Sequence, residues 1–213
     1  MSSDRFLDDL AADLAPVRPR RPRRDMLLLA AVGAVELALF LLFGAARHDI
    51  MLAMKLPSFW WKLGSLGALT IVGAVTAIRS LDPAVSPRRG LRLFAVTAGV
   101  AVAIGWVIDA SGGGGAALAA RLMWRHGIDC VFAMVVLSVP AIVALGLLMR
   151  RGAPTDRRGS ALAAGATSAA WGAFVFVFKC PHDDPFYIAV WYVVGCAIVM
   201  VAGRLLLPLV TRW

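Results

Sequence analysis

The chain has 213 residues, of which 60% are hydrophobic and 16% charged, with a formal net charge of +9. Together with a mean hydropathy of +0.78, this composition excludes an ordinary soluble domain and predicts an integral membrane protein.

The first predicted element is a short amphipathic helix over residues 2–15 (SSDRFLDDLAADLA). Acidic residues take one face, and the apolar stripe on the other consists of Phe6, Leu7, Leu10 and Leu14. Pro16 ends the helix, and a Pro-Arg segment continues to Arg24. A helix of this length needs a partner to be stable. It either lies on the membrane and its loops or docks in a groove of a cytosolic protein, and the pattern leaves both open.

Six long apolar runs follow and predict an all-α integral membrane protein with six transmembrane helices. Each run is close to the roughly 20 residues that cross a hydrocarbon core. The predicted spans cover residues 26–46, 59–78, 91–109, 128–149, 160–179 and 186–207. The chain therefore divides into an N-terminal tail, residues 1–25, and a six-helix transmembrane domain, residues 26–213.

The positive charge follows the predicted topology. Most of the 22 Lys and Arg residues lie in the tail, in the second and fourth loops and at the C-terminal end, which six spans place on one side. The positive-inside rule then makes both termini cytoplasmic. We predict contact with the lipid bilayer and no direct contact with nucleic acid. Four aromatic residues are expected in a belt at the outer interface: Trp60, Trp61, Trp191 and Tyr192.

Glu36 is the one acidic residue inside the first predicted span. An ionisable group at that depth costs about 3 kcal/mol on insertion scales and tends to be functional. It either forms a hydrogen bond between helices, which we favour, or serves as a proton site in a transporter.

Two of the three cysteines are predicted to lie side by side at the periplasmic ends of neighbouring spans. Cys130 opens the fourth span and Cys180 closes the fifth, and the short loop between these spans makes them antiparallel neighbours. At 1.5 Å per residue, both cysteines lie about 30 Å from that loop and therefore at one depth. Cys196, deeper in the sixth span, is expected to serve packing.

Imidazole and carboxylate groups surround this predicted pair: His126, Asp129, His182, Asp183 and Asp184. Thiolate with imidazole and carboxylate is a ligand set for zinc or a heavier, softer metal. In an oxidising compartment the same thiols form a disulfide, and a third interpretation is that they only fill space or form a static bridge. The residues leave these alternatives open.

Enzyme motifs are missing from the sequence. There is no Cys-x-x-Cys pair, no Ser/His/Asp nucleophile set, no phosphate loop and no zinc-protease motif. We therefore predict no catalysis and no resident cofactor beyond a transient metal ion or disulfide at Cys130 and Cys180.

Several short segments occur in a fixed order along the chain. The tail ends in Ala-Asp-Leu-Ala-Pro-Val (12–17), Cys130 opens the fourth span, and Arg-Arg-Gly-Ala-Pro (150–154) closes it. Cys-Pro-His-Asp-Asp-Pro-Phe (180–186) then leads to Trp191-Tyr192. Together these segments resemble the NrsF family of bacterial membrane anti-sigma factors. The likeness covers nearly the whole chain, and the cysteine-containing signature is its most specific part.

The resemblance implies a function that composition does not give. Members of this family hold an extracytoplasmic-function sigma factor at the inner membrane, out of reach of RNA polymerase. Their paired periplasmic cysteines take part in sensing heavy-metal or oxidative stress, and by position these correspond to Cys130 and Cys180. The tail stripe then becomes the expected sigma-binding element. The alternative is a small membrane transporter or metal-handling protein that uses Glu36 and the Cys/His/Asp cluster.

Overall fold

The computed structural model describes residues 21–43, 46–111 and 121–210 of the chain. Within these ranges the fold is entirely helical, with six long helices and one short one. The helices are α2 (Pro22–Leu42), α3 (Ile50–Ala53), α4 (Pro57–Arg79), α5 (Arg88–Ser111), α7 (Trp124–Arg151), α8 (Arg157–Phe176) and α9 (Pro185–Val210).

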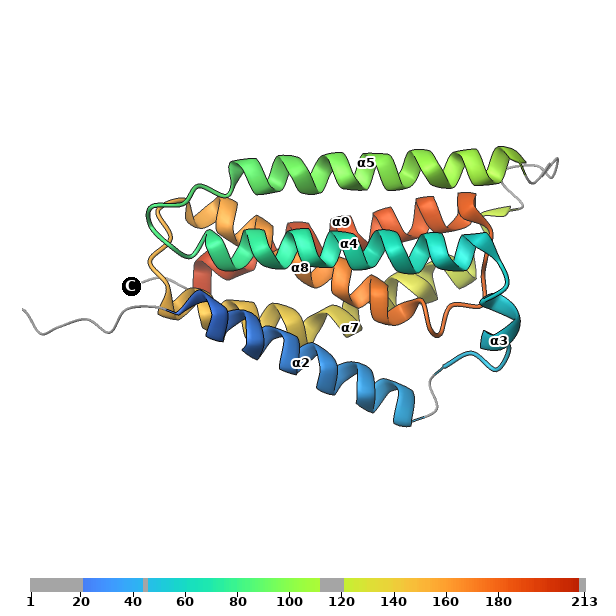
Figure 1. Cartoon of the computed structure of the whole chain (residues 1–213), viewed down its shortest axis with the longest axis horizontal. Helices are drawn as coiled ribbons and strands as arrows, with labels where there is room; N and C mark the ends of the chain where they lie inside the picture. The colour runs from blue at the N-terminus through green and yellow to red at the C-terminus, as the bar shows by residue number, and fades with distance from the viewer. Residues whose placement is uncertain (1–20, 44–45, 112–120, 211–213) are drawn as a thin grey trace, which may run out of the picture.

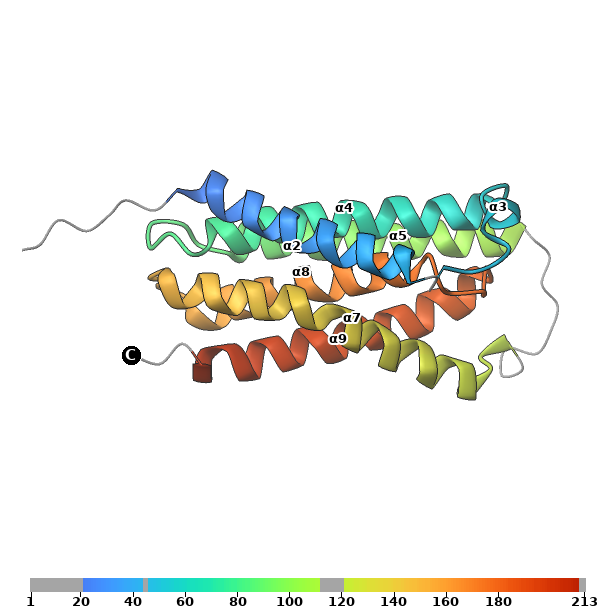
Figure 2. The same cartoon turned by 90° about the horizontal axis from the view of Figure 1, so that it is seen from below.

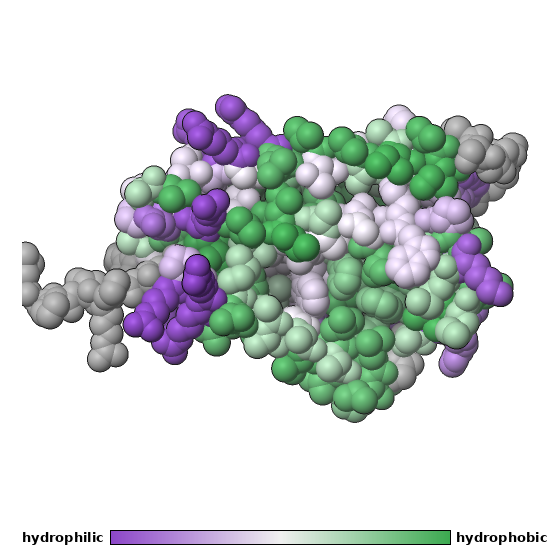
Figure 3. Space-filling view, viewed as in Figure 1, coloured by the Kyte–Doolittle hydropathy of each residue, from purple (hydrophilic) through white to green (hydrophobic). Residues whose placement is uncertain are grey.

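The six long helices run lengthwise beside one another and form an elongated bundle (Figures 1 and 2). Each is long and apolar enough to cross a membrane. The start of α2 and the end of α9 lie at the same end of the bundle, called here the Pro22 end. The opposite end, where α8 gives way to α9, is called the thiol end. Apolar residues cover most of the visible surface, and the most hydrophilic ones gather towards the two ends (Figure 3).

Each of the six predicted spans corresponds to a helix long and apolar enough to cross a membrane, but the ends of the helices differ from the predicted bounds. Several helices begin earlier than the predicted spans. The predicted spans were bounded by charged residues, whereas a helix continues through them; α7, for example, begins at Trp124 rather than at residue 128. The prediction was wrong in the other direction for α2, which ends at Leu42, and for α8, which ends at Phe176. After α8 the chain makes one further turn, in which the Cys180 amide donates to the Phe176 carbonyl at 3.0 Å. Pro181 then disfavours further helix. The predicted tail helix over residues 2–15 lies outside the described residues.

Helix α8 is the centre of the bundle. It packs against α4, α7 and α9, and most of its residues are buried Ala, Gly, Ser and Thr. Small side chains let helix backbones approach closely where lipid provides no hydrophobic drive for association. At Gly165, an added Cβ would lie 3.0 Å from the Met200 carbonyl oxygen of α9; at Gly172, it would lie 2.7 Å from the Met134 carbonyl oxygen of α7. A Cβ therefore does not fit at Gly172 unless α7 shifts, and at Gly165 it would need α9 to give by a few tenths of an ångström.

Helix α2 lies at the periphery and has no buried residue. Its contacts are mainly with α7 and α4. One close contact with α8 occurs at Gly33, where an added Cβ would lie 3.0 Å from the Trp171 indole ring. The helix that follows the N-terminal tail is thus the most loosely held of the six.

The packing of α8 on α9 predicts that Gly203→Ala destabilises the bundle. A Cβ at Gly203 would lie 2.7 Å from the Cα atom of Gly165, and neither backbone can move aside. Overpacking of this kind costs about 1–3 kcal/mol. Gly99→Ala is the matched control because nothing lies within 4 Å of its Cβ position. Thermal unfolding of both variants in detergent measures the difference, and an equal midpoint would contradict the packing described.

Candidate functional site

The thiol end brings Cys130 and Cys180 into direct contact. Cys130 lies in the second turn of α7 and Cys180 in the loop after α8, and their side chains hydrogen-bond to each other. Both are free thiols. Cys130 is 4% exposed and Cys180 is 0% exposed. The prediction that these two cysteines meet at one depth is confirmed.

Hydroxyl and carbonyl groups complete the surroundings of the two sulfurs. The Tyr187 hydroxyl of α9 lies 3.2 Å from Cys130 Sγ, and the Cys180 thiol points at the His182 carbonyl oxygen, 3.7 Å away. Tyr192, one and a half turns further along α9, is also close to Cys180. Three separate segments, α7, the α8–α9 loop and α9, therefore enclose the pair.

The electrostatics of the pair are unequal. The hydrogen bond from the Cys130 thiol lowers the pKa of Cys180 to about 6, against the opposing effect of burial and with help from the Lys62 charge. A thiolate is the reactive form of cysteine, for oxidants and metals alike. Cys180 is therefore the activated thiol at neutral pH.

A buried ion network holds the loop that carries Cys180. The Arg47 guanidinium donates to both carboxylate oxygens of Asp183 at 3.1 and 2.9 Å, and to the Cys180 carbonyl oxygen at 3.0 Å. Lys62 Nζ donates to Asp183 and to the His182 carbonyl oxygen, both at 2.9 Å. Asp49 accepts two further bonds from Arg47, both 2.7 Å. Side chains from α4 and from the segment after α2 thus fix residues 180–183.

Asp183 is the centre of this network. Its side chain is 18% exposed, while those of Lys62 and Arg47 are 0% and 5% exposed. Desolvation raises the pKa of Asp183, but hydrogen bonds from Arg47 and Lys62 outweigh it and leave the pKa below its ordinary value. The carboxylate is therefore ionised; it is the countercharge of Lys62 and shares Arg47 with Asp49.

A second ion cluster fixes the start of α9. Arg121 pairs with Asp109 at the end of α5 and with Asp184. Asp184 in turn accepts from the Phe186 amide at 2.9 Å, as a capping residue does at a helix N-terminus. The Arg121 guanidinium also lies over the Phe186 ring, 5.2 Å from its centroid. This cluster joins α5 to the α8–α9 loop.

A groove of about 660 Å³ leads to the Cys130 side of the pair. Its polar lining comes from four of the residues that the sequence singled out, together with a lysine: His126, Asp129, Cys130, His182 and Lys179. The His126 and His182 rings meet edge to face, with centroids 5.5 Å apart. Burial, helped by the His126 and Lys62 charges, lowers the pKa of His182, so that its imidazole is neutral at pH 7.

The predicted metal ligands do not all gather. Across residues 21–43, 46–111 and 121–210, no three His, Cys, Asp or Glu side chains are arranged to hold a metal ion. Asp183 faces Lys62 and Arg47 rather than the groove. A transient metal at Cys130 and Cys180 stays a prediction, and two adjacent thiols with a neutral imidazole nearby are suited to a soft ion.

Other predicted residues have structural surroundings. Glu36 Oε2 accepts from the Trp171 indole of α8 at 2.8 Å, which is the interhelical hydrogen bond we favoured. Cys196 is partly buried and packs towards the Ala169 carbonyl oxygen. The outer aromatic belt was wrong for Trp191 and Tyr192, which are 6% and 4% exposed and belong to the core. The tail residues Phe6, Leu7, Leu10 and Leu14 lie outside the described residues.

The sequence does not indicate the groups that surround the thiols in the structure: Arg47, Lys62, Tyr187 and Tyr192. A lysine next to an apolar run was one available signal, since a charge at that position requires a partner. The partner itself, Asp183, lies 121 residues away and no local pattern indicates it.

Fold and site define a class: a bundle of six helices able to cross a membrane, with a buried thiol pair at one end and a peripheral first helix that follows the N-terminal tail. A family model described as "NrsF: Negative regulator of sigma F" matches residues 10–213. The chain therefore belongs to the NrsF family, as its resemblance in sequence predicted.

Two curated relatives match over their full length and that of this chain. The anti-sigma-F factor NrsF of Caulobacter vibrioides (strain NA1000 / CB15N) is 34% identical over 224 residues. The probable anti-sigma-F factor NrsF of Azospira oryzae (strain ATCC BAA-33 / DSM 13638 / PS) is 32% identical over 225 residues. No solved structure matches.

The ion network predicts that Asp183→Asn is strongly destabilising. The change leaves the buried Lys62 without its countercharge and Arg47 with Asp49 alone, and an uncompensated buried charge of this kind costs about 3–5 kcal/mol. Asp49→Asn is the matched control, because it removes the other carboxylate that pairs with Arg47. The Asp49 side chain is 51% exposed, so we expect a much smaller loss of stability. Chemical unfolding in detergent compares the two variants.

The same network has a defined pH dependence. The folded-state pKa of Asp183 lies below the ordinary 3.8, so its stabilisation is fully present above that value and is lost as the pH falls through the folded-state pKa. The acid-induced loss of stability should therefore be smaller in Asp183→Asn. An unchanged acid profile would contradict the role given to this carboxylate.

The thiol contact predicts how Cys180 titrates. In a Cys196→Ala background, the ultraviolet absorbance of the thiolate should rise with a midpoint at about pH 6. Cys130→Ala removes the hydrogen-bond donor, so the midpoint should move up towards the ordinary value of 9.0. Cys180→Ala should abolish the low-pH transition, which assigns it. A midpoint that Cys130→Ala leaves in place would show that the contact does not activate Cys180.

Proposed function

We propose that this protein is a membrane-bound anti-sigma factor of the bacterial inner membrane. It sequesters a sigma factor of the extracytoplasmic-function type through its N-terminal tail and releases it when the thiol pair meets a heavy metal or an oxidant. The observation that carries the proposal is the family match over residues 10–213, together with two full-length relatives named as anti-sigma-F factors.

The charge distribution supports the orientation that this function needs. Arginines gather at the Pro22 end, just before α2 and in the terminal turns of α2, α4, α5, α7 and α8: Arg21, Arg23, Arg24, Arg79, Arg88, Arg89, Arg92, Arg150, Arg151, Arg157 and Arg158. By the positive-inside rule, this end faces the cytoplasm and the thiol end faces the periplasm. The tail then lies where sigma factors are, and the thiols lie where external metals and oxidants arrive.

Two kinds of signal suit the thiol pair. An oxidant that accepts two electrons converts the two thiols into a disulfide with loss of two protons. A soft metal ion instead replaces the thiol protons and bridges the sulfurs. Either change removes the hydrogen bond between Cys130 and Cys180, and with it the lowered pKa of the Cys180 thiol.

Arg47 ties the Cys180 loop to the segment that follows α2. Its guanidinium holds the Cys180 carbonyl oxygen, and its amide donates to the Phe178 carbonyl at 2.8 Å. Arg47 comes five residues after α2 ends at Leu42, and the tail precedes the other end of the same helix. A shift of the Cys180 loop therefore acts on α2, which no buried residue anchors. We propose that movement of α2 changes how the tail presents its apolar stripe, Phe6, Leu7, Leu10 and Leu14.

A pull-down from detergent-solubilised membranes tests this function. Three forms of the protein serve as bait: the full chain, a triple variant with Leu7, Leu10 and Leu14 changed to Ala, and a matched variant with Asp8, Asp9 and Asp13 changed to Asn. We expect a sigma factor, identified by mass spectrometry, with the full chain and the Asp variant. The Leu variant should retain less than a tenth of it, because the apolar stripe supplies the binding surface.

The sensing step is tested with the same assay after cells are exposed to a cadmium salt or to peroxide. Treatment should release the sigma factor from the full chain, whereas a variant with both Cys130 and Cys180 changed to Ser should keep it bound. Release from the serine variant would refute sensing by the thiols and leave the anti-sigma function standing. No sigma factor with any bait would refute the function itself and favour a transporter.

A further inference from the structure

A basic pocket of about 810 Å³ lies at the Pro22 end, where the start of α2 meets the end of α4 and the loop after it. Four arginines and one aspartate supply its charge: Arg21, Arg23, Arg24, Arg79 and Asp82. Four positive charges and one negative charge give the lining a net charge of +3. The hydrophilic cluster at the start of α2 is visible in Figure 3.

The arginines of this pocket lack countercharges. Within residues 21–43, 46–111 and 121–210, none of the four guanidinium groups forms an ion pair. Asp82 uses one carboxylate oxygen to accept from the Ala84 amide at 2.9 Å, so it is partly occupied by its own loop. The arginines are exposed and free to bind an anion from outside the chain.

An apolar groove of about 440 Å³ lies next along the same two helices. Leu27 and Ile78 line the basic pocket, and one turn further into the bundle Ala30 and Ala74 line the groove. The groove reaches Leu37, ten residues beyond Leu27 and therefore about 15 Å along α2. This is half of the roughly 30 Å hydrocarbon core, which is the depth of one leaflet.

The groove suits a hydrocarbon chain, because each of its polar side chains already has a partner within the protein. The Thr70 and Thr167 hydroxyls donate to carbonyl oxygens one turn earlier, at 2.8 and 2.7 Å. The Trp171 indole donates to Glu36 at 2.8 Å. Ile71, which also lines the groove, is 66% exposed, so the groove is open to lipid from the side.

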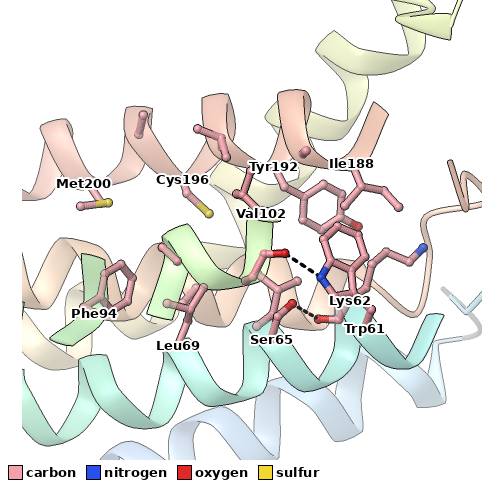
Figure 4. A pocket seen from close by; sticks show the side chains of 17 residues that line it. Trp61, Lys62, Ser65, Leu69, Phe94, Val102, Ile188, Tyr192, Cys196 and Met200 are labelled. Carbon is pink, nitrogen blue, oxygen red and sulfur yellow. Dashed lines mark hydrogen bonds between the residues drawn. The ribbon is translucent and has the colours of Figure 1, made fainter. Parts of the chain in front are cut away.

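The apolar cavity between α4, α5 and α9 differs from this site (Figure 4). Its volume is about 200 Å³, and the one cation in its lining, Lys62, is already bonded to Asp183 and to the His182 carbonyl oxygen. The Tyr192 hydroxyl at the same end has the Cys180 sulfur as its partner. No unpaired charge in that lining selects a ligand, whereas the basic pocket has four.

We propose that the basic pocket and the apolar groove together bind one anionic phospholipid, with its head group on the arginines and one acyl chain between α2 and α4. Basic pockets between membrane helices on the cytoplasmic side bind acidic head groups. A soluble acidic protein would reach the arginines but not the groove. A zwitterionic lipid would bring a further cation to a pocket that is already positive.

The bound acyl chain would fill the space beside α2, a helix that no buried residue anchors. The lipid would thus hold α2 to the bundle. The inference rests on the membrane location and orientation given under the proposed function, but not on sigma-factor binding.

Binding can be measured by native mass spectrometry of the full chain, stripped of lipid in detergent and titrated with phosphatidylglycerol or with phosphatidylcholine of the same acyl chains. The test variant changes three arginines of the pocket to Gln: Arg23, Arg24 and Arg79. The matched control changes three arginines that lie at the same end of the bundle but do not line the pocket: Arg88, Arg89 and Arg92. Both variants lose the same charge. Ala74→Leu narrows the groove from α4.

We expect the full chain to prefer phosphatidylglycerol over phosphatidylcholine by at least about tenfold. The test variant should lose this preference, because each arginine near a head group contributes about fivefold, whereas the matched control should keep it. Ala74→Leu should weaken phosphatidylglycerol binding. Should that variant fail to fold, the two arginine variants still decide the question.

Two results would overturn the proposal. An equal loss of preference in both arginine variants would show only a general attraction of anionic lipid to the positive end of the bundle. Competition by glycerol phosphate as strong as that of the lipid would show a site for a free anion. No sigma factor is present in this assay, so either result would leave the proposed anti-sigma function standing.

Discussion

The close approach of α8 to its three neighbours is the constraint on which the rest of the structure depends. In a membrane, packing and hydrogen bonds hold helices together, because lipid tails are as apolar as the side chains they would replace. The glycine, alanine and serine surface of α8 permits contact with α4, α7 and α9 at once. Cys130 on α7 and Tyr187 on α9 thereby reach the loop that follows α8. A bulkier α8 would separate the two cysteines even with every residue of the thiol end unchanged.

Charge then fixes what packing has brought together. Lys62 and Arg47 are buried cations, each satisfied by Asp183 and by a backbone carbonyl of the loop. Such groups are costly to bury and costly to disturb, so the loop conformation is strongly determined. The thiol end is accordingly the rigid part of the molecule, whereas α2 packs on the outside through few contacts. Under the proposed function, a rigid thiol end joined to a loosely held α2 suits a sensor, because a small local change moves the most weakly packed helix first.

Helix number and the meeting of Cys130 with Cys180 were predictable, since both depend only on apolar run length and on 1.5 Å rise per residue. The central place of α8 could also have been predicted from its small residues, which signal helix contact rather than lipid contact. The groups that surround the thiols could not be predicted from the sequence. The bond from Arg47 to Asp183 joins residues 136 positions apart, and no periodicity reports such a pairing. Trp191 and Tyr192 were placed at the lipid interface because α9 is apolar on every side, so its sequence does not give its rotation.

The two sides of the thiol pair differ in a way that orders events at the site. Cys130 lines the open groove with His126 and Asp129, whereas Cys180 is wholly buried and adjoins the apolar cavity through Tyr192. A water-borne oxidant or metal therefore meets Cys130 first, while the lower pKa belongs to Cys180 behind it. Under the proposed function, attack on the modified Cys130 falls to the Cys180 thiolate, already in contact, so closure of the disulfide needs no large motion. The proposed movement starts at Cys180, whose carbonyl oxygen accepts a hydrogen bond from Arg47. Disulfide formation and the connection to α2 therefore begin at the same residue.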